Sequence, residues 1–168
     1  EDRHNTPGDG KVGGEGAIDG RRVAIAGDDI TVKKGSSAIV GSRRLGRLLD
    51  RAIERGMPYV YIGETGGGRI PDLIGAEGIS DIAPSPILAR RPRKIPMASV
   101  IVGQSFGGSS FQSAFSDFVV QVRGSVMAVT SPRVFEIATG EIVSAEELGG
   151  VDVHSRITGQ IDIGVETY

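Results

Sequence analysis

The sequence predicts an α/β fold in which tight glycine turns join β-strands to α-helices. Glycine accounts for 26 of the 168 residues, well above the roughly 7% of an average chain. The glycines gather between apolar runs, and the order strand, glycine turn, helix occurs twice. An Asp-Gly pair between apolar runs adds a β-hairpin. Such units build layers of helix and sheet, with backbone N–H groups exposed where each helix begins.

Composition narrows the class of protein. A chain of 168 residues, 39% hydrophobic, can bury one core, so residues 1–168 are expected to form one domain. The formal net charge of -2 gives no reason to expect a nucleic-acid partner. No apolar run reaches the roughly 18 residues of a membrane span, and there is no cysteine. We therefore expect a soluble, cytoplasmic protein without a metal site or membrane partner. Because the chain starts with Glu1 rather than Met, we expect a fragment.

The first ordered element is predicted to be a hairpin. Residues 1–11 are polar and rich in turn formers, so they are interpreted as a loosely ordered lead-in, with structure beginning at Val12. The pair Asp19-Gly20 readily adopts the positive φ angles of a type I′ turn. The first strands of the sheet are therefore predicted to be antiparallel.

Residues 36–56 give the clearest helical pattern, because apolar side chains recur there at helical spacing. Those side chains are Leu45, Leu48, Leu49, Ala52 and Ile53. Gly56 and Pro58 are predicted to end the helix. A short buried strand, Tyr59–Ile62, then leads into a glycine turn at residues 63–68.

The same order returns later, with a strand at 98–102, a turn at 103–108 and a helix at 109–115. Residues 118–122 and 125–130 are predicted to be two further strands.

Two other segments carry local signals. The prolines and basic residues of 83–96 predict a helix end and an exposed connection. Ser144–Glu147 matches a capping box, and Gly149-Gly150 is expected to close one or two helical turns.

The pair Gly107-Gly108 is the leading candidate for an active element. It lies between a predicted strand and a predicted helix, where two unpaired backbone N–H groups could face one oxyanion. The alternative is a turn made glycine-rich for packing, and spacing alone does not separate the two. Gly66-Gly67-Gly68 forms a second turn of this kind, which favours a shared binding edge.

Gly103–Gly107 also spells the nucleophile elbow of serine hydrolases, with Ser105 as the nucleophile. A base would have to come from His4 or His154, and an orienting carboxylate from Asp117 or Asp152. A structural role is the more common one for such a histidine.

A glycine motif, a basic run and two acidic pairs are less specific signals. The spacing of Gly8–Gly13 fits a dinucleotide fingerprint, but no strand precedes it, so this interpretation is rejected. Arg90-Arg91 and Arg93-Lys94 could bind a CoA phosphate, although such runs are more often solvated surface. The acidic pairs Asp28-Asp29 and Glu146-Glu147 are assigned to surface solvation and helix capping.

Read in order, several segments resemble the carboxyltransferase family that includes the β subunits of acetyl-CoA and propionyl-CoA carboxylases. The segments are Gly8-Asp-Gly10, Asp19-Gly20, Thr31-Val32, Gly35-Ser36, Glu64–Ile70, Gly103–Gly108, Ser116-Asp117, Thr139–Gly150, His154 and Thr158-Gly159. The resemblance covers nearly the whole chain, and the ordered series is far more specific than any one segment.

The resemblance implies a crotonase-like spiral of repeated ββα units and carboxyl transfer from carboxybiotin to the α-carbon of a short acyl-CoA. It implies that the N–H groups of Gly107 and Gly108 stabilise the thioester enolate. Residues expected to bind substrate are Gly66, Gly67, Gly68, Arg69, Ser105 and Phe106. The expected partners are acyl-CoA, a biotinylated carrier with its biotin carboxylase, a C-terminal carboxyltransferase half and further copies of the chain.

The chain departs from the family pattern at two places. Phe106-Gly-Gly-Ser109 replaces Ala-Gly-Gly-Ala, and Thr65 replaces serine before the other glycine turn. The four cysteines of the zinc-ribbon subgroup are absent. A biotin-dependent acyl-CoA decarboxylase, a serine hydrolase and a noncatalytic binding module remain as alternatives.

Overall fold

A computed structural model describes residues 4–76, 80 and 94–167 of the chain. Most of the predicted connection at 83–96 lies outside these residues, as do Arg90, Arg91 and Arg93 of the proposed phosphate-binding run.

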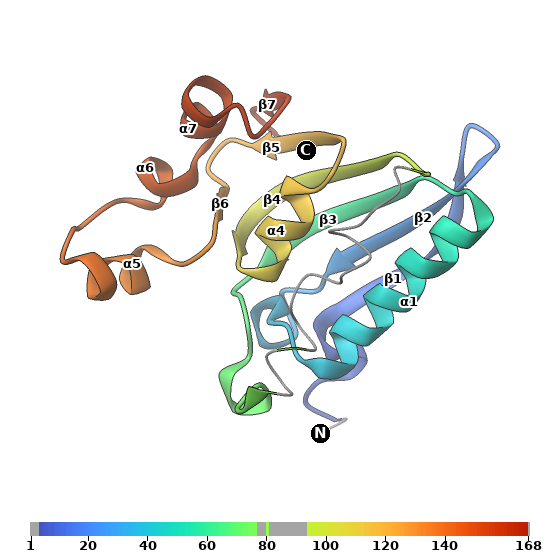
Figure 1. The fold of residues 1–168 in the computed structure, drawn as a ribbon, viewed down its shortest axis with the longest axis horizontal. Coiled ribbons are helices and arrows are strands. Elements are labelled where there is room, and N and C mark those ends of the chain that lie inside the picture. Colours follow the sequence, from blue (N-terminus) through green and yellow to red (C-terminus); the bar gives the residue numbers. More distant parts are fainter. Residues whose placement is uncertain (1–3, 77–79, 81–93, 168) are drawn as a thin grey trace.

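The described chain contains a seven-stranded sheet in the order β1-β2-β3-β4-β5-β7, with β6 paired to β4 (Figure 1). Only β1 and β2 are antiparallel, and all other pairs are parallel. The strands are β1 (Lys11–Ile18), β2 (Arg21–Asp28), β3 (Tyr59–Thr65), β4 (Met97–Phe106), β5 (Phe118–Val122), β6 (Val126–Ala128) and β7 (Ile163–Val165).

The predicted hairpin is confirmed. Asp19 and Gly20 have φ angles of 48° and 77°, the sign that a type I′ turn requires at both positions. The turn sets a register in which Ile18 pairs with Arg21 and Lys11 pairs with Asp28.

Helix α1 (Ile39–Arg55) confirms the clearest helical prediction and ends at Gly56, which is left-handed. It packs along β1 and β2 (Figure 1). The five apolar side chains that predicted the helix all belong to, or pack against, one core cluster. That cluster comprises Ala24, Ala26, Leu49, Ala52, Met57, Tyr59, Tyr61, Ile95 and Met97.

Further helices follow β4 in the chain. They are α4 (Gly108–Ala114), α5 (Pro132–Thr139), α6 (Ala145–Gly149) and α7 (Val151–Val153). Short turns of other helix types are η1 (Pro7–Gly10), η2 (Lys33–Gly35), η3 (Ile70–Asp72) and η4 (His154–Thr158). In Figure 1, α5, α6 and α7 lie at the opposite side of the molecule from α1.

Three predicted strands have other bounds in the structure, and two elements were not predicted. Strands β3 and β4 are longer than predicted, because Thr65 pairs with Ser105 and Gln104–Phe106 pair with β6. Strand β6 is shorter than the predicted 125–130. Helix α5 was not predicted, although Ser131 accepts a hydrogen bond from Val134 N and Pro132 occupies the first turn, and neither was β7.

The supposed lead-in is also ordered from Pro7 onward. Asp9 is 4% exposed and Lys11, the first residue of β1, is 3% exposed. The Asp9 carboxylate accepts a hydrogen bond from Gly41 N at 2.6 Å and pairs with Arg69 at 2.6 Å. Polar composition suggested disorder, but these charges are buried because they are paired.

None of the helices among the described residues is long and apolar enough to cross a bilayer. No group of three or more His, Asp or Glu side chains among those residues is placed to hold a metal ion.

The capping box before α6 is confirmed, since Ser144 Oγ accepts from Glu147 N and Glu147 Oε2 accepts from Ser144 N. We expect Ser144→Ala to lower the free energy of unfolding by about 1 kcal/mol, because one cap is lost. Urea denaturation measures this, with Ser155→Ala at an exposed position as the control. Equal stability of the two variants would contradict the prediction.

Candidate functional site

Parallel pairing places the two glycine turns next to each other. Strands β3 and β4 are parallel neighbours, and Thr65 at the end of β3 pairs with Ser105 near the end of β4. A Cβ atom placed on Gly67 would lie 3.8 Å from Cβ of Phe106. Carboxyl ends of parallel strands form the usual ligand edge of an α/β sheet. The two turns thus lie at the same edge of the sheet, and ligand binding at this edge stays a prediction.

Gly107 makes the sharp turn between β4 and α4. Its φ of 65° and ψ of −121° are a combination that L side chains avoid. A Cβ atom there would meet no atom within 4 Å. Conformation rather than crowding therefore requires glycine, and the space beside the turn is open.

The two N–H groups of this turn differ. Gly107 N donates to Ala128 O at 3.3 Å, a long hydrogen bond within the sheet. Gly108 is the first residue of α4 and is exposed. The first N–H groups of a helix have no intrahelical acceptor, and within the described part of the chain none accepts from Gly108 N. The Gly108 N–H is the freer of the two donors.

The Gly66–Gly68 turn differs from Gly107-Gly108, because the N–H groups of Gly66 and Gly67 are hydrogen-bonded within the protein. Gly66 N donates to Lys34 O at 2.9 Å, and Gly67 N donates to Thr65 Oγ1 at 3.2 Å. Gly67 O accepts from Ser37 N at 2.8 Å. This turn can form a wall beside Gly107 but offers fewer donors.

Arg69 lies behind the glycine turn with its guanidinium bonded to protein. It pairs with Asp9 at 2.6 Å and with Asp72 at 3.2 Å, and Nη2 donates to Ser36 O at 3.0 Å. Its side chain is 11% exposed. These contacts favour a role in holding the turn over direct contact with a substrate.

A buried polar series that the sequence did not predict runs beneath the Gly107-Gly108 turn. The Asp28 carboxylate pairs with Lys11 at 2.5 Å and accepts from Tyr61 OH at 2.6 Å. Tyr61 OH also lies 2.8 Å from Ser109 Oγ, which lies 2.8 Å from Ser105 Oγ. The hairpin register was the signal that could have found its first pair, since it sets Lys11 opposite Asp28.

The assignment of Asp28 to solvated surface was therefore wrong, because its side chain is 0% exposed. Burial raises the pKa of the Asp28 carboxyl, and the Lys11 ammonium works against that shift. Burial also raises the pKa of the Tyr61 phenol well above its usual value, so Tyr61 keeps its proton and can donate it. Asp29, by contrast, is bonded to Thr31 at the surface.

Ser105 is not at a nucleophile elbow. It lies inside β4 with 0% exposure, whereas an elbow serine sits on the turn itself. His154 bonds through Nε2 to Met127 O at 2.7 Å and through Nδ1 to Thr158 Oγ1 at 2.9 Å. Asp117 accepts from Met97 N. The serine hydrolase interpretation was wrong, and His154 has the structural role.

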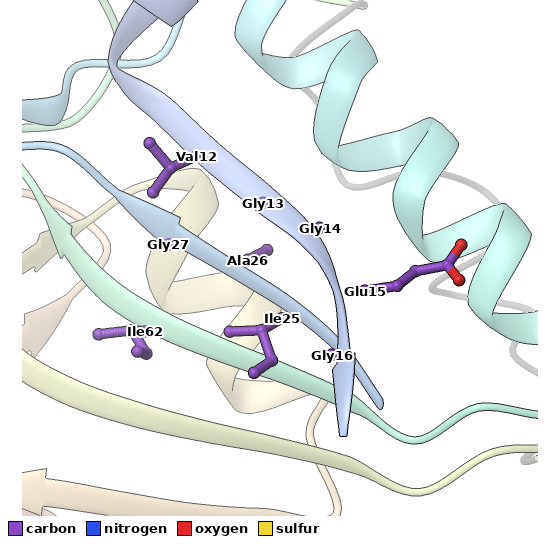
Figure 2. A pocket seen from close by; sticks show the side chains of 9 residues that line it. All are labelled: Val12, Gly13, Gly14, Glu15, Gly16, Ile25, Ala26, Gly27 and Ile62. Carbon is purple, nitrogen blue, oxygen red and sulfur yellow. The ribbon is translucent and has the colours of Figure 1, made fainter. Parts of the chain in front are cut away.

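An apolar pocket of about 310 Å³ lies elsewhere, over the hairpin and β3 (Figure 2). Its lining residues are Val12, Gly13, Gly14, Glu15, Gly16, Ile25, Ala26, Gly27 and Ile62. Glu15, the one charged residue, extends toward α1 (Figure 2) and pairs with Arg55 at 3.1 Å. The pocket thus holds no free group that could carry out chemistry.

The glycine turns at one edge of a mainly parallel sheet define an α/β protein of the crotonase-like class. The chain belongs to the carboxyl transferase domain family, whose model matches residues 1–167. It is 36% identical over 157 residues to the propionyl-CoA carboxylase beta chain of Cereibacter sphaeroides, spanning 92% of this chain and 30% of that one.

Two further comparisons agree. The chain is 34% identical over 168 residues to the methylmalonyl-CoA decarboxylase subunit alpha of Veillonella parvula, spanning 99% of this chain and 33% of that one. A crystal structure of the transcarboxylase 12S hexamer, with methylmalonyl-coenzyme A and methylmalonic acid bound, superposes with a TM-score of 0.84 at 32% identity. That match covers 95% of this chain and 31% of the other. The chain thus spans about a third of its relatives' length, and the predicted crotonase-like fold is confirmed.

The burial of Asp28 predicts a pH dependence of stability. Because the folded pKa is raised, Asp28 contributes stability that is present below its unfolded pKa of about 3.9 and lost as pH rises through the folded value. We expect the unfolding free energy of the wild type, relative to Asp28→Asn, to fall from pH 4 toward pH 7. Urea denaturation across this range measures the difference, and a flat difference would refute the assignment.

The burial of Ser105 predicts its chemical behaviour. We expect a fluorophosphonate probe not to label Ser105, because the hydroxyl is buried and its hydrogen-bond partner among the described residues is Ser109 rather than a histidine. Mass spectrometry of peptides from the treated protein tests this. Labelling that disappears in Ser105→Ala would restore the hydrolase interpretation.

Proposed function

We propose that this chain is the N-terminal part of the carboxyltransferase of a biotin-dependent acyl-CoA carboxylase. Its family membership and its propionyl-CoA carboxylase relative support the class of reaction. The structural observation that carries the proposal is the open Gly107-Gly108 turn beside Gly66–Gly68 at the carboxyl edge of the sheet.

The turn has the chemistry that an acyl-CoA thioester needs. When the α-carbon of the acyl group loses a proton, which biotin held outside this chain would accept, negative charge develops on the thioester oxygen. The exposed Gly108 N–H can donate to that oxygen. The Gly107 N–H, whose hydrogen bond to Ala128 O is long, can share its proton between Ala128 O and the thioester oxygen. Fixed donors stabilise such charge because they need no reorganisation during the reaction. The chain therefore acts through backbone atoms.

The remaining predicted site residues surround this turn. Gly66, Gly67 and Gly68 form the neighbouring wall, and their lack of side chains leaves room for the thioester. Phe106 is 6% exposed and directly precedes the turn, with its Cβ 3.8 Å from a Cβ atom placed on Gly67. Ser105 and Arg69 support these elements from behind through Ser109 and Asp9.

The carboxyl group would be supplied by biotin attached to a separate carrier protein and charged by a biotin carboxylase. We assign no described residue to biotin, and we propose that a C-terminal half of the enzyme binds it. The chain spans only about 30% of its propionyl-CoA carboxylase relative, which leaves room for such a half. Assembly from several copies and a cytoplasmic location complete the proposal, the latter because a chain without cysteine fits a reducing compartment.

A decarboxylase subunit is the second candidate, because one relative is named methylmalonyl-CoA decarboxylase. Removing a carboxyl group from an acyl-CoA produces the same enolate, so the same turn serves both directions. Assaying the complete enzyme with propionyl-CoA and with methylmalonyl-CoA separates them.

Gly108→Pro tests the role of the backbone. Proline is tolerated at the first position of a helix but has no N–H group, so it removes the donor and keeps α4. In the complete carboxyltransferase that carries this chain, we expect kcat to fall by roughly 10²- to 10³-fold.

Gly108→Ala, which keeps the N–H group, is the matched control and should retain most of the activity. Steady-state carboxylation of propionyl-CoA measures both variants. Equal activity of the proline and alanine variants would overturn the proposed role of Gly108.

A further inference from the structure

We propose that the buried series from Ser105 through Ser109, Tyr61 and Asp28 to Lys11 holds the Gly107-Gly108 turn in position, with Ser109 and Tyr61 as positioning residues. This inference rests on the proposed function and deepens it. It assigns roles in the reaction to side chains that do not touch the substrate.

Ser109 connects the turn to the sheet. It directly follows Gly108 and is 5% exposed. Its Oγ lies 2.8 Å from Tyr61 OH on β3 and 2.8 Å from Ser105 Oγ on β4. The first turn of α4 is thereby bonded to both strands that end at the site. A shift of the turn would break one of these bonds.

Hydrogen bonds connect every member of the series. Tyr61 OH lies 2.6 Å from Asp28 Oδ2 and 2.8 Å from Ser109 Oγ, and it can donate its single proton to either. Between Ser109 and Ser105 either hydroxyl can be the donor. Lys11 donates to Asp28 and, at 2.7 Å, to Gly35 O. A buried series in which every member has a hydrogen-bond partner is more rigid than its separate bonds.

Close packing leaves little freedom around the series. A Cβ atom on Gly63 would lie 3.0 Å from Ser109 Oγ and 3.1 Å from Cε1 of Tyr61. A side chain there would crowd Ser109, so glycine at 63 makes room for the connection. Tyr61 itself is 2% exposed.

The consequence for catalysis follows from geometry. An N–H donor stabilises a developing oxyanion only at the correct position, and small misplacements lose much of the effect. Freeing Ser109 leaves the Gly108 N–H present but less well placed. We therefore expect the loss mainly in kcat.

The test uses Ser109→Ala, Tyr61→Phe and the double variant in the complete carboxyltransferase. Each single variant should lower kcat roughly tenfold, with the KM for acyl-CoA changed less than about twofold. The double variant should lose little more than either single one, because all three break the same series.

Ser113→Ala is the matched control. Ser113 is also a buried serine of α4, at 0% exposure, and its Oγ has no hydrogen-bond partner in the described part of the chain. Its removal should leave kcat unchanged. Unfolding curves for all variants separate changes in kcat from changes in stability.

Three results would count against the proposal. Unchanged kcat in Ser109→Ala and Tyr61→Phe, with kcat still strongly lowered in Gly108→Pro, would overturn the positioning role and leave the proposed function standing. An equal loss in Ser113→Ala would show that the effect comes from packing alone. Full activity of Gly108→Pro beside Gly108→Ala would overturn the proposed function, and this inference with it.

Discussion

Strands β3 and β4 lie parallel and end at the same edge of the sheet, and each is followed by a glycine turn. This pairing decides which residues can meet. It sets Gly67 beside Phe106, and it brings Tyr61 within reach of Ser109, although the two are 48 residues apart in the sequence. Helix α4 and the open turn before it take their position from the end of β4. The candidate site thus forms only because β3 and β4 pair and bring the two glycine turns together.

Beneath this edge the protein buries an ion pair, Lys11–Asp28, with side chains 3% and 0% exposed. Removing two charges from water is costly, and a hydrophobic pair of similar volume is often at least as stable. The pair is connected to Tyr61 and through it to the helix that follows the glycine turn. A buried charge pair of this kind fixes the orientation of polar neighbours, which an apolar pair cannot do.

The predictions that succeeded rest on local signals. Asp19-Gly20, the apolar stripe of α1 and the Ser144 capping box each specify their structure within a few residues. The predictions that failed depend on distant partners: β4 extends through Ser105 because β3 and β6 pair with it there. The glycine turns were located from the sequence, but the difference between the N–H groups of Gly107 and Gly108 was not. Gly107 N donates to Ala128 O, and that acceptor is brought to the turn by the pairing of β6 with β4.

The hairpin turn at Asp19-Gly20 lies at the far end of the ribbon from the ion pair it aligns, since Lys11 and Asp28 form the last pair of the register. Side chains alternate between the two faces of a strand, so a slip of one residue would put these charges on opposite faces. Hairpins joined by two residues close in microseconds, whereas parallel strands must wait for longer connections. The hairpin would therefore close first, starting at Asp19-Gly20. Lys11 and Asp28 would then be in register before the parallel strands pair.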